Sequence, residues 1–257
     1  MKLQDSHAHI YLEQFDEDLA DVVERAQEVG LDKIYMPNID HTSIDRMLET
    51  SEKYPGFCIP MMGLHPCSVD KKFEKELYLV EEWLAKSDQF VAVGEIGTDL
   101  YWDKTHFEQQ KEAFRIQSDL AIQYDLPIVI HCRESLDENI ALVEEFYDKG
   151  LKGVFHCFSG SIEQARKIIE LGFYLGIGGV ATFKNGGLVE LLPEIPMESI
   201  VLETDSPYLA PTPLRGKRNE PSFIKHIAEK IAVAKNLDVE KIGEIAAQNT
   251  ATLFKAN

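Results

Sequence analysis

The segment Lys2-Leu3-Gln4-Asp5-Ser6-His7-Ala8-His9 decides how the rest of the chain is interpreted. We interpret it as an extended strand, on which side chains two residues apart point to the same face. His7 and His9 therefore share a face, and Asp5 falls on the same face one step further into the strand. Imidazole is a common nitrogen ligand of zinc and similar cations. The pair indicates either half of a metal site or a buried histidine pair without a metal.

Short apolar runs recur along the chain, and segments with helical spacing separate most of them. The expected strands span residues 3–7, 33–36, 57–62, 90–94, 128–131, 153–155, 173–177 and 200–202. Helices are expected over 16–29, 106–124 and 238–254, and capping boxes are expected at Ser135 and Ser161. The seventh strand–helix unit has the weakest pattern. Eight strands alternating with helices predict an α/β fold, a single (β/α)8 TIM-barrel domain over residues 1–257.

The composition is that of an ordinary globular protein, with 44% hydrophobic and 27% charged residues among 257. A formal net charge of −18 argues against a DNA coat protein, which would be basic. It does not exclude an enzyme acting on phosphodiesters, because bound divalent cations reverse the local charge. With no signal peptide, no apolar run of membrane-spanning length and no CxxC spacing, we expect a cytoplasmic protein with reduced thiols and no membrane contact.

Polar side chains gather at the carboxyl ends of the expected strands, where barrels of this type carry their chemistry. The set comprises His7, His9, His65, Glu95, Asp99, His131, His156, Glu203 and Asp205. Buried together without a metal, these groups would leave unpaired polar atoms and like charges. With divalent cations, His7, His9 and Asp205 would complete one site, His131 and His156 the other, and Glu95 could bridge the two. His41, His106 and His226 are assigned to surface or capping positions.

The ordered set resembles the TatD family, a metal-dependent DNase branch of the amidohydrolase-like barrels. The resemblance rests on His7-x-His9, Gly94-Glu95-Ile96-Gly97, His131, His156 and Glu203-Thr204-Asp205-Ser206-Pro207-Tyr208-Leu209, and it extends from Asp5 to about Phe254. It implies the metal ligands His7, His9, Glu95, His131, His156 and Asp205, two divalent cations (Mg, Mn or Zn), and a bridging Glu95. It also implies that DNA is hydrolysed from a 3′ end by metal-activated water, with Glu95 and Asp205 as catalytic residues.

Further residues are candidates to hold the substrate or to support a ligand. His65, Arg133 and Arg218 could bind phosphate oxygens, which guanidinium groups match well. Arg218 could equally be a solvated loop charge. Glu203 could support a ligand histidine from outside the site. Tyr101 and Trp102, which follow Asp99, could stack on a base or pack their own loop. We expect transient DNA binding by a monomer.

Two other functions are compatible with these residues. A different hydrolase on the same scaffold could cleave an aminoacyl-tRNA ester or a small cyclic amide, because a fold does not fix its substrate. A non-catalytic metal-binding scaffold would use closed four-coordinate sites, which a bridging Glu95 does not suit. The basic residues at 215–218 and Arg133 favour a substrate that carries phosphate.

Overall fold

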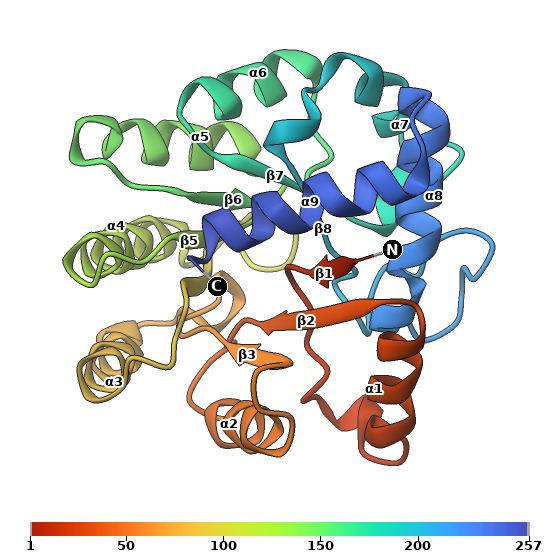
Figure 1. The fold of residues 1–257 in the computed structure, drawn as a ribbon. Coiled ribbons are helices and arrows are strands. Elements are labelled where there is room, and N and C mark those ends of the chain that lie inside the picture. Colours follow the sequence, from red (N-terminus) through yellow and green to blue (C-terminus); the bar gives the residue numbers. More distant parts are fainter. Residues whose placement is uncertain (1, 256–257) are drawn as a thin grey trace.

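The computed structural model describes residues 2–255, in which eight parallel strands are surrounded by helices (Figure 1). The strands are β1 (Leu3–Asp5), β2 (Leu31–Met36), β3 (Cys58–Pro60), β4 (Val93–Asp99), β5 (Ile128–Arg133), β6 (Gly153–Phe155), β7 (Tyr174–Ile177) and β8 (Ile200–Leu202). The helices are α1 (Leu19–Glu28), α2 (Ile44–Lys53), α3 (Phe73–Lys86), α4 (Phe107–Gln123), α5 (Leu136–Glu144), α6 (Ile162–Glu170), α7 (Leu188–Leu191), α8 (Ile224–Lys235) and α9 (Val239–Leu253). Within the described residues, no helix is long and apolar enough to cross a bilayer.

Residues beyond the regular strands close two sheets into one barrel. Strands β1 to β3 form one sheet and β4 to β8 the other, each strand pairing with its neighbour in sequence. Parallel bridges join Ala8 to Ser206 at one seam and Met62 to Val93 at the other. The (β/α)8 barrel expected from the sequence is confirmed.

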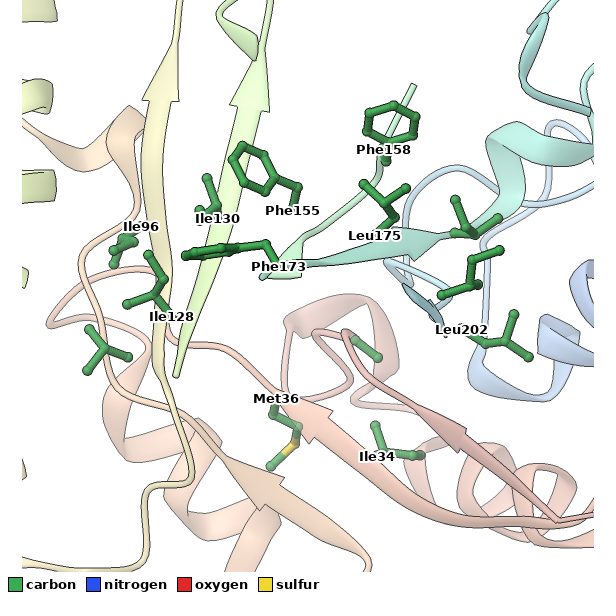
Figure 2. Packing of buried hydrophobic residues seen from close by; sticks show 14 of the residues in the cluster. Ile34, Met36, Ile96, Ile128, Ile130, Phe155, Phe158, Phe173, Leu175 and Leu202 are labelled. Carbon is green, nitrogen blue, oxygen red and sulfur yellow. The ribbon is translucent and has the colours of Figure 1, made fainter. Parts of the chain in front are cut away.

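Alternation along the strands separates an outer from an inner apolar layer. Ile128 and Ile130 of β5 belong to the outer core, where they lie near Phe155 and Phe173 (Figure 2). Val129, between them, belongs to a second cluster, whose other members in or next to the strands are Tyr35, Met61, Ala92, Val154 and Val201. Because side chains alternate, the inward positions that follow this layer are polar ones. The inner layer is therefore the floor beneath the polar side chains at the strand ends.

Helix α9 runs across the ring of strands and closes the base of the barrel (Figure 1). At its end, Leu253 and Phe254 join the inner layer. The ring of Phe254 packs on that of Tyr35, with 4.4 Å between their centroids. The end of the carboxyl-terminal helix thus completes the interior core.

Among the strands that differ in extent from the expectation, β4 and β1 change the placement of site residues. Strand β4 continues to Asp99, so Glu95 lies within it and not after its end. Strand β1 ends at Asp5, so His7 and His9 follow the strand. The seventh unit has the short helix that its weak pattern indicated, since α7 spans only four residues.

The two expected capping boxes have different outcomes. The box at Ser161 is confirmed, with Ser161 and Gln164 bonded to each other's backbone N–H groups. The box at Ser135 is absent, and the expectation was wrong. The hydroxyl of Ser135 instead donates a hydrogen bond to the buried carbonyl of Thr98 at 2.8 Å. A buried carbonyl without a donor would be costly, so the strand end takes the hydroxyl that the helix could have used.

Replacing Phe254 with alanine tests the closure of the barrel base. Because Phe254 is buried against Tyr35, we expect Phe254→Ala to lower the free energy of unfolding by about 3–5 kcal/mol. Urea denaturation followed by circular dichroism measures this loss. Val233→Ala is the control, because Val233 is 80% exposed and its truncation should change stability by less than about 0.5 kcal/mol. A loss below about 1 kcal/mol for Phe254→Ala would contradict the assigned role.

Candidate metal centre

The carboxylate of Glu95 lies at the centre of a buried group of histidines at the carboxyl ends of the strands. Its Oε2 atom is 3.2 Å from Nε2 of His7 and 3.4 Å from Nε2 of His9. Its Oε1 atom is 2.8 Å from Nε2 of His156 and 2.9 Å from Nδ1 of His131. The two oxygens of one carboxylate therefore face two different pairs of histidines.

Asp205 and His65 complete the two sides. Asp205 Oδ1 lies 3.7 Å from Nε2 of His7 and 3.8 Å from Nε2 of His9. His65 Nε2 lies 3.5 Å from Oε1 of Glu95, on the other side. Three sets of ligand atoms are close enough together to hold a metal ion: His7, His9 and Glu95; His7, His156 and Asp205; and His65, Glu95 and His131. The structure thus brings together the six expected ligands and adds His65, which we expected at the substrate.

The donor chemistry of this cluster fits a divalent cation. Nε2 of His7 and Nε2 of His9 are 3.1 Å apart, and Nε2 of His156 and Nδ1 of His131 are 3.5 Å apart. Each of these contacts can share only one proton between two ring nitrogens. Burying so many polar groups with few protons is costly. A cation among these atoms would satisfy the converging lone pairs.

Burial and neighbouring charges shift the pKa values of several groups in the cluster. Burial lowers the pKa of His7 well below its ordinary value, so the imidazole is neutral. Burial acts to raise the pKa of Glu95, but the nearby histidines, His156 first, outweigh it and hold this pKa well below its ordinary value. Burial raises the pKa of Asp205 to about 6. At neutral pH both carboxylates are ionised, as metal binding requires.

The glycines of Gly94-Glu95-Ile96-Gly97 allow the strands to meet closely around Glu95. Gly97 has a φ of +140°, and a Cβ atom there would collide with the carbonyl oxygen of His131. A Cβ atom on Gly63 would lie 2.7 Å from the carbonyl carbon of Gly94. Only glycine tolerates such approaches without strain. The short backbone separation places Glu95 within reach of histidines from both sides.

Each of three site histidines also contacts a polar group outside the cluster. Glu203 Oε1 is 3.5 Å from Nδ1 of His156. The same atom accepts a hydrogen bond from the N–H of Cys157 at 2.5 Å. Sequence reasoning missed two further contacts. Asp99 Oδ2 lies 2.9 Å from Nε2 of His131, and Tyr11 Oη lies 2.9 Å from Nδ1 of His9.

The missed contacts had a signal in the sequence. Tyr11 continues the alternation of His7 and His9, and Asp99 continues that of Glu95 and Gly97. Polar partners of this kind fix the orientation of a ligand ring. Tyr11 and Asp99 therefore lie where a supporting group would be sought first.

Asp5 lies outside the cluster, although strand alternation placed it with the two histidines. Its carboxylate accepts hydrogen bonds from N–H and Oγ1 of Thr204 at 2.9 and 2.5 Å, and from N–H of His7 at 3.2 Å. The alternation does not extend from Asp5 to His7 because β1 ends at Asp5. Asp5 instead joins β1 to the segment after β8, where Asp205 N–H donates to the carbonyl of His7.

The two candidate arginines lie in different surroundings. Arg218 donates to Asp18 at 2.7 Å through each terminal nitrogen and to the carbonyl of Gln14 at 2.6 Å. Arg133, at the carboxyl end of β5, has its guanidinium 3.6 Å from the ring centre of Tyr101. His41 and His226 pair with Glu76 and Glu229 outside the cluster.

Comparison with known proteins gives one consistent family. A family model described as TatD related DNase matches residues 4–255. The metal-dependent hydrolase YabD of Bacillus subtilis (strain 168) is 40% identical over 256 residues, covering 99% of this chain and 100% of its own. The 3′-5′ ssDNA/RNA exonuclease TatD of Edwardsiella piscicida is 35% identical over 248 residues, covering 94% and 95%.

A solved structure agrees with these relatives. The crystal structure of YjjV, a TatD homologue from Escherichia coli K12, superposes with a TM-score of 0.93 at 29% identity and covers 99% of this chain and 98% of that chain. The family model and both relatives extend over nearly the whole chain. This protein belongs to the TatD-related DNase family of metal-dependent hydrolases.

Proposed function

We propose that this protein hydrolyses phosphodiester bonds of DNA from a 3′ end, with two divalent cations (Mg, Mn or Zn) in its site. The observation that carries the proposal is Glu95, whose two oxygens face separate histidine pairs. A carboxylate so placed suits a two-cation hydrolytic site. Membership of a DNase family and a relative named as a 3′-5′ ssDNA/RNA exonuclease support the reaction type and its direction.

In this proposal the chain supplies the ligands and a proton acceptor. His7, His9 and Asp205 would hold one cation, His131 and His156 the other, and Glu95 would lie between them. Bound divalent cations supply Lewis acidity and a lowered pKa for the attacking water. Asp205 is the proposed proton acceptor, because its side chain is 14% exposed and that of Glu95 only 3%. A carboxylate at the open side of the cluster can reach a water that enters with the substrate.

His65, Arg133 and Arg218 are the proposed contacts to substrate phosphates. Arg133 is the better placed of the two arginines to bind a phosphate, because within residues 2–255 no carboxylate forms an ion pair with it. Arg218 would have to exchange Asp18 for a phosphate. Glu203 is proposed to support His156.

The setting of the reaction is part of the same proposal. Four free cysteines support a reducing compartment such as the cytoplasm. A closed barrel offers no open sheet edge for pairing with another chain, which supports a monomer. Because β1 meets β8 in the same barrel, residues 1–257 are proposed to act as one domain.

Asp205→Asn tests the proposed proton acceptor. The amide keeps the shape of the side chain but cannot take a proton, so we expect kcat on single-stranded DNA to fall by roughly 10²–10⁴-fold. Circular dichroism should remain that of the wild type. Asp119→Asn is the matched control, since Asp119 is a surface residue of α4 with a 62% exposed side chain. An activity within twofold of the wild type for Asp205→Asn would exclude the assigned role.

A substrate and metal panel tests the reaction class. We expect hydrolysis of single-stranded DNA that requires added Mg, Mn, Zn or Co and stops when a chelator is added. The proposed reaction depends on bound cations to activate the attacking water. The measurement is product length by gel electrophoresis, with 3′- and 5′-labelled strands to give the direction. Duplex DNA, RNA and aminoacyl-tRNA serve as comparison substrates. Cleavage of the aminoacyl ester alone would favour the other hydrolase on this scaffold, and DNA cleavage that survives exhaustive chelation would contradict the proposal.

A further inference from the structure

We propose that Tyr101, Trp102 and Arg133 form a subsite for an unpaired base of single-stranded nucleic acid and the phosphate beside it. The proposal rests on the proposed nuclease function and adds to it the part of the substrate that the protein recognises. These residues lie at the carboxyl ends of β4 and β5. The metal cluster lies at the same ends of the same strands.

The two aromatic rings are open to solvent beside the site. Tyr101 is 47% exposed and Trp102 is 69% exposed. Their ring centroids are 4.8 Å apart and the planes stand at 87°. A ring that served only to pack its own loop would be largely covered, and Trp102 in particular is not. Exposed aromatic faces beside a nuclease site are the groups on which nucleic-acid bases stack.

Arg133 adds a positive charge to this aromatic pair. Five arginines form ion pairs with carboxylates, namely Arg25, Arg46, Arg115, Arg166 and Arg218. In the described part of the chain, Arg133 has no such partner, although the sequence has 44 acidic residues. Its guanidinium lies 3.6 Å from the ring centre of Tyr101 and 5.2 Å from that of Trp102. A stacked guanidinium keeps its N–H groups at the edge of its plane, where they can donate hydrogen bonds to phosphate oxygens.

A single carboxylate fixes this subsite relative to the metal cluster. Asp99 Oδ1 accepts hydrogen bonds from the N–H groups of Tyr101 and Trp102 at 2.9 and 3.0 Å. Its other oxygen, Oδ2, lies 2.9 Å from Nε2 of His131. One buried side chain therefore holds both the aromatic loop and a proposed metal ligand. A base stacked on these rings would lie at a constant distance from the reacting phosphate.

The geometry selects unpaired bases. In a duplex each base is stacked on its neighbours and its faces are covered, whereas a single strand can offer a base to an aromatic ring. The subsite therefore favours single-stranded substrates, and stacking tolerates any base sequence. Tyr101 and Trp102 are expected to contribute to substrate affinity and not to the chemical step.

The binding test uses Trp102 as its own probe. The sequence has two tryptophans, and the other, Trp83, packs against the core beside Phe90. In a Trp83→Phe variant, fluorescence reports Trp102 alone. With chelator present to prevent cleavage, a single-stranded DNA dodecamer should quench this fluorescence. The same oligonucleotide with abasic 3′-terminal residues should bind about 10-fold more weakly. Equal quenching and equal affinity for the two oligonucleotides would overturn the proposal.

A kinetic test separates affinity from chemistry. Trp102→Ala and Tyr101→Ala should each raise KM for the intact oligonucleotide about 10-fold with kcat unchanged, and neither should change KM for the abasic one. Tyr147→Leu is the control, because Tyr147 is 61% exposed in the connection from α5 to β6, which enters the barrel from the opposite end. If the wild type cleaves no nucleic acid but the base-dependent quenching is observed, the proposed hydrolysis fails and the subsite is supported. If cleavage occurs without an effect of either variant on KM, the subsite fails alone.

Discussion

Glu95 offers one carboxylate oxygen to His7 and His9 and the other to His131 and His156, from the middle of a buried strand. A buried anion would be unfavourable without charge compensation. The histidines partly supply it, since they hold the pKa of Glu95 well below its ordinary value. Divalent cations would supply the rest. The other groups of the cluster lie on one side or the other of this carboxylate.

The barrel makes this arrangement possible through strand alternation. An inward apolar residue such as Val129 or Val154 supports the floor, and the residue two positions later is a site histidine. The glycines next to Glu95 let neighbouring backbones approach, so the polar groups meet above that floor. Helix α9 seals the opposite end. The site is therefore open on one side only, where Asp205 and the exposed rings of Tyr101 and Trp102 lie.

The strand order and the convergence of the polar residues could be predicted because both depend on local periodicity and on where parallel strands end. What failed depends on contacts between distant residues. Asp5 accepts hydrogen bonds from Thr204, and Ser135 donates to the carbonyl of Thr98. Each of these contacts satisfies a buried polar group whose partner is distant in the sequence. A single sequence does not show which distant residue that partner is. Asp99 was placed at the strand ends without a contact assigned to it, and Tyr11 was not singled out at all.

The most direct test of the central claim is the number and position of bound cations. Crystals grown with Mn²⁺ and measured for anomalous scattering should show two ions per chain, roughly 3.5–4 Å apart. One ion should lie against His7 and His9, the other against His131 and His156, with Glu95 between them. A single ion held by four protein ligands in a closed site, as in structural zinc sites, would contradict the account.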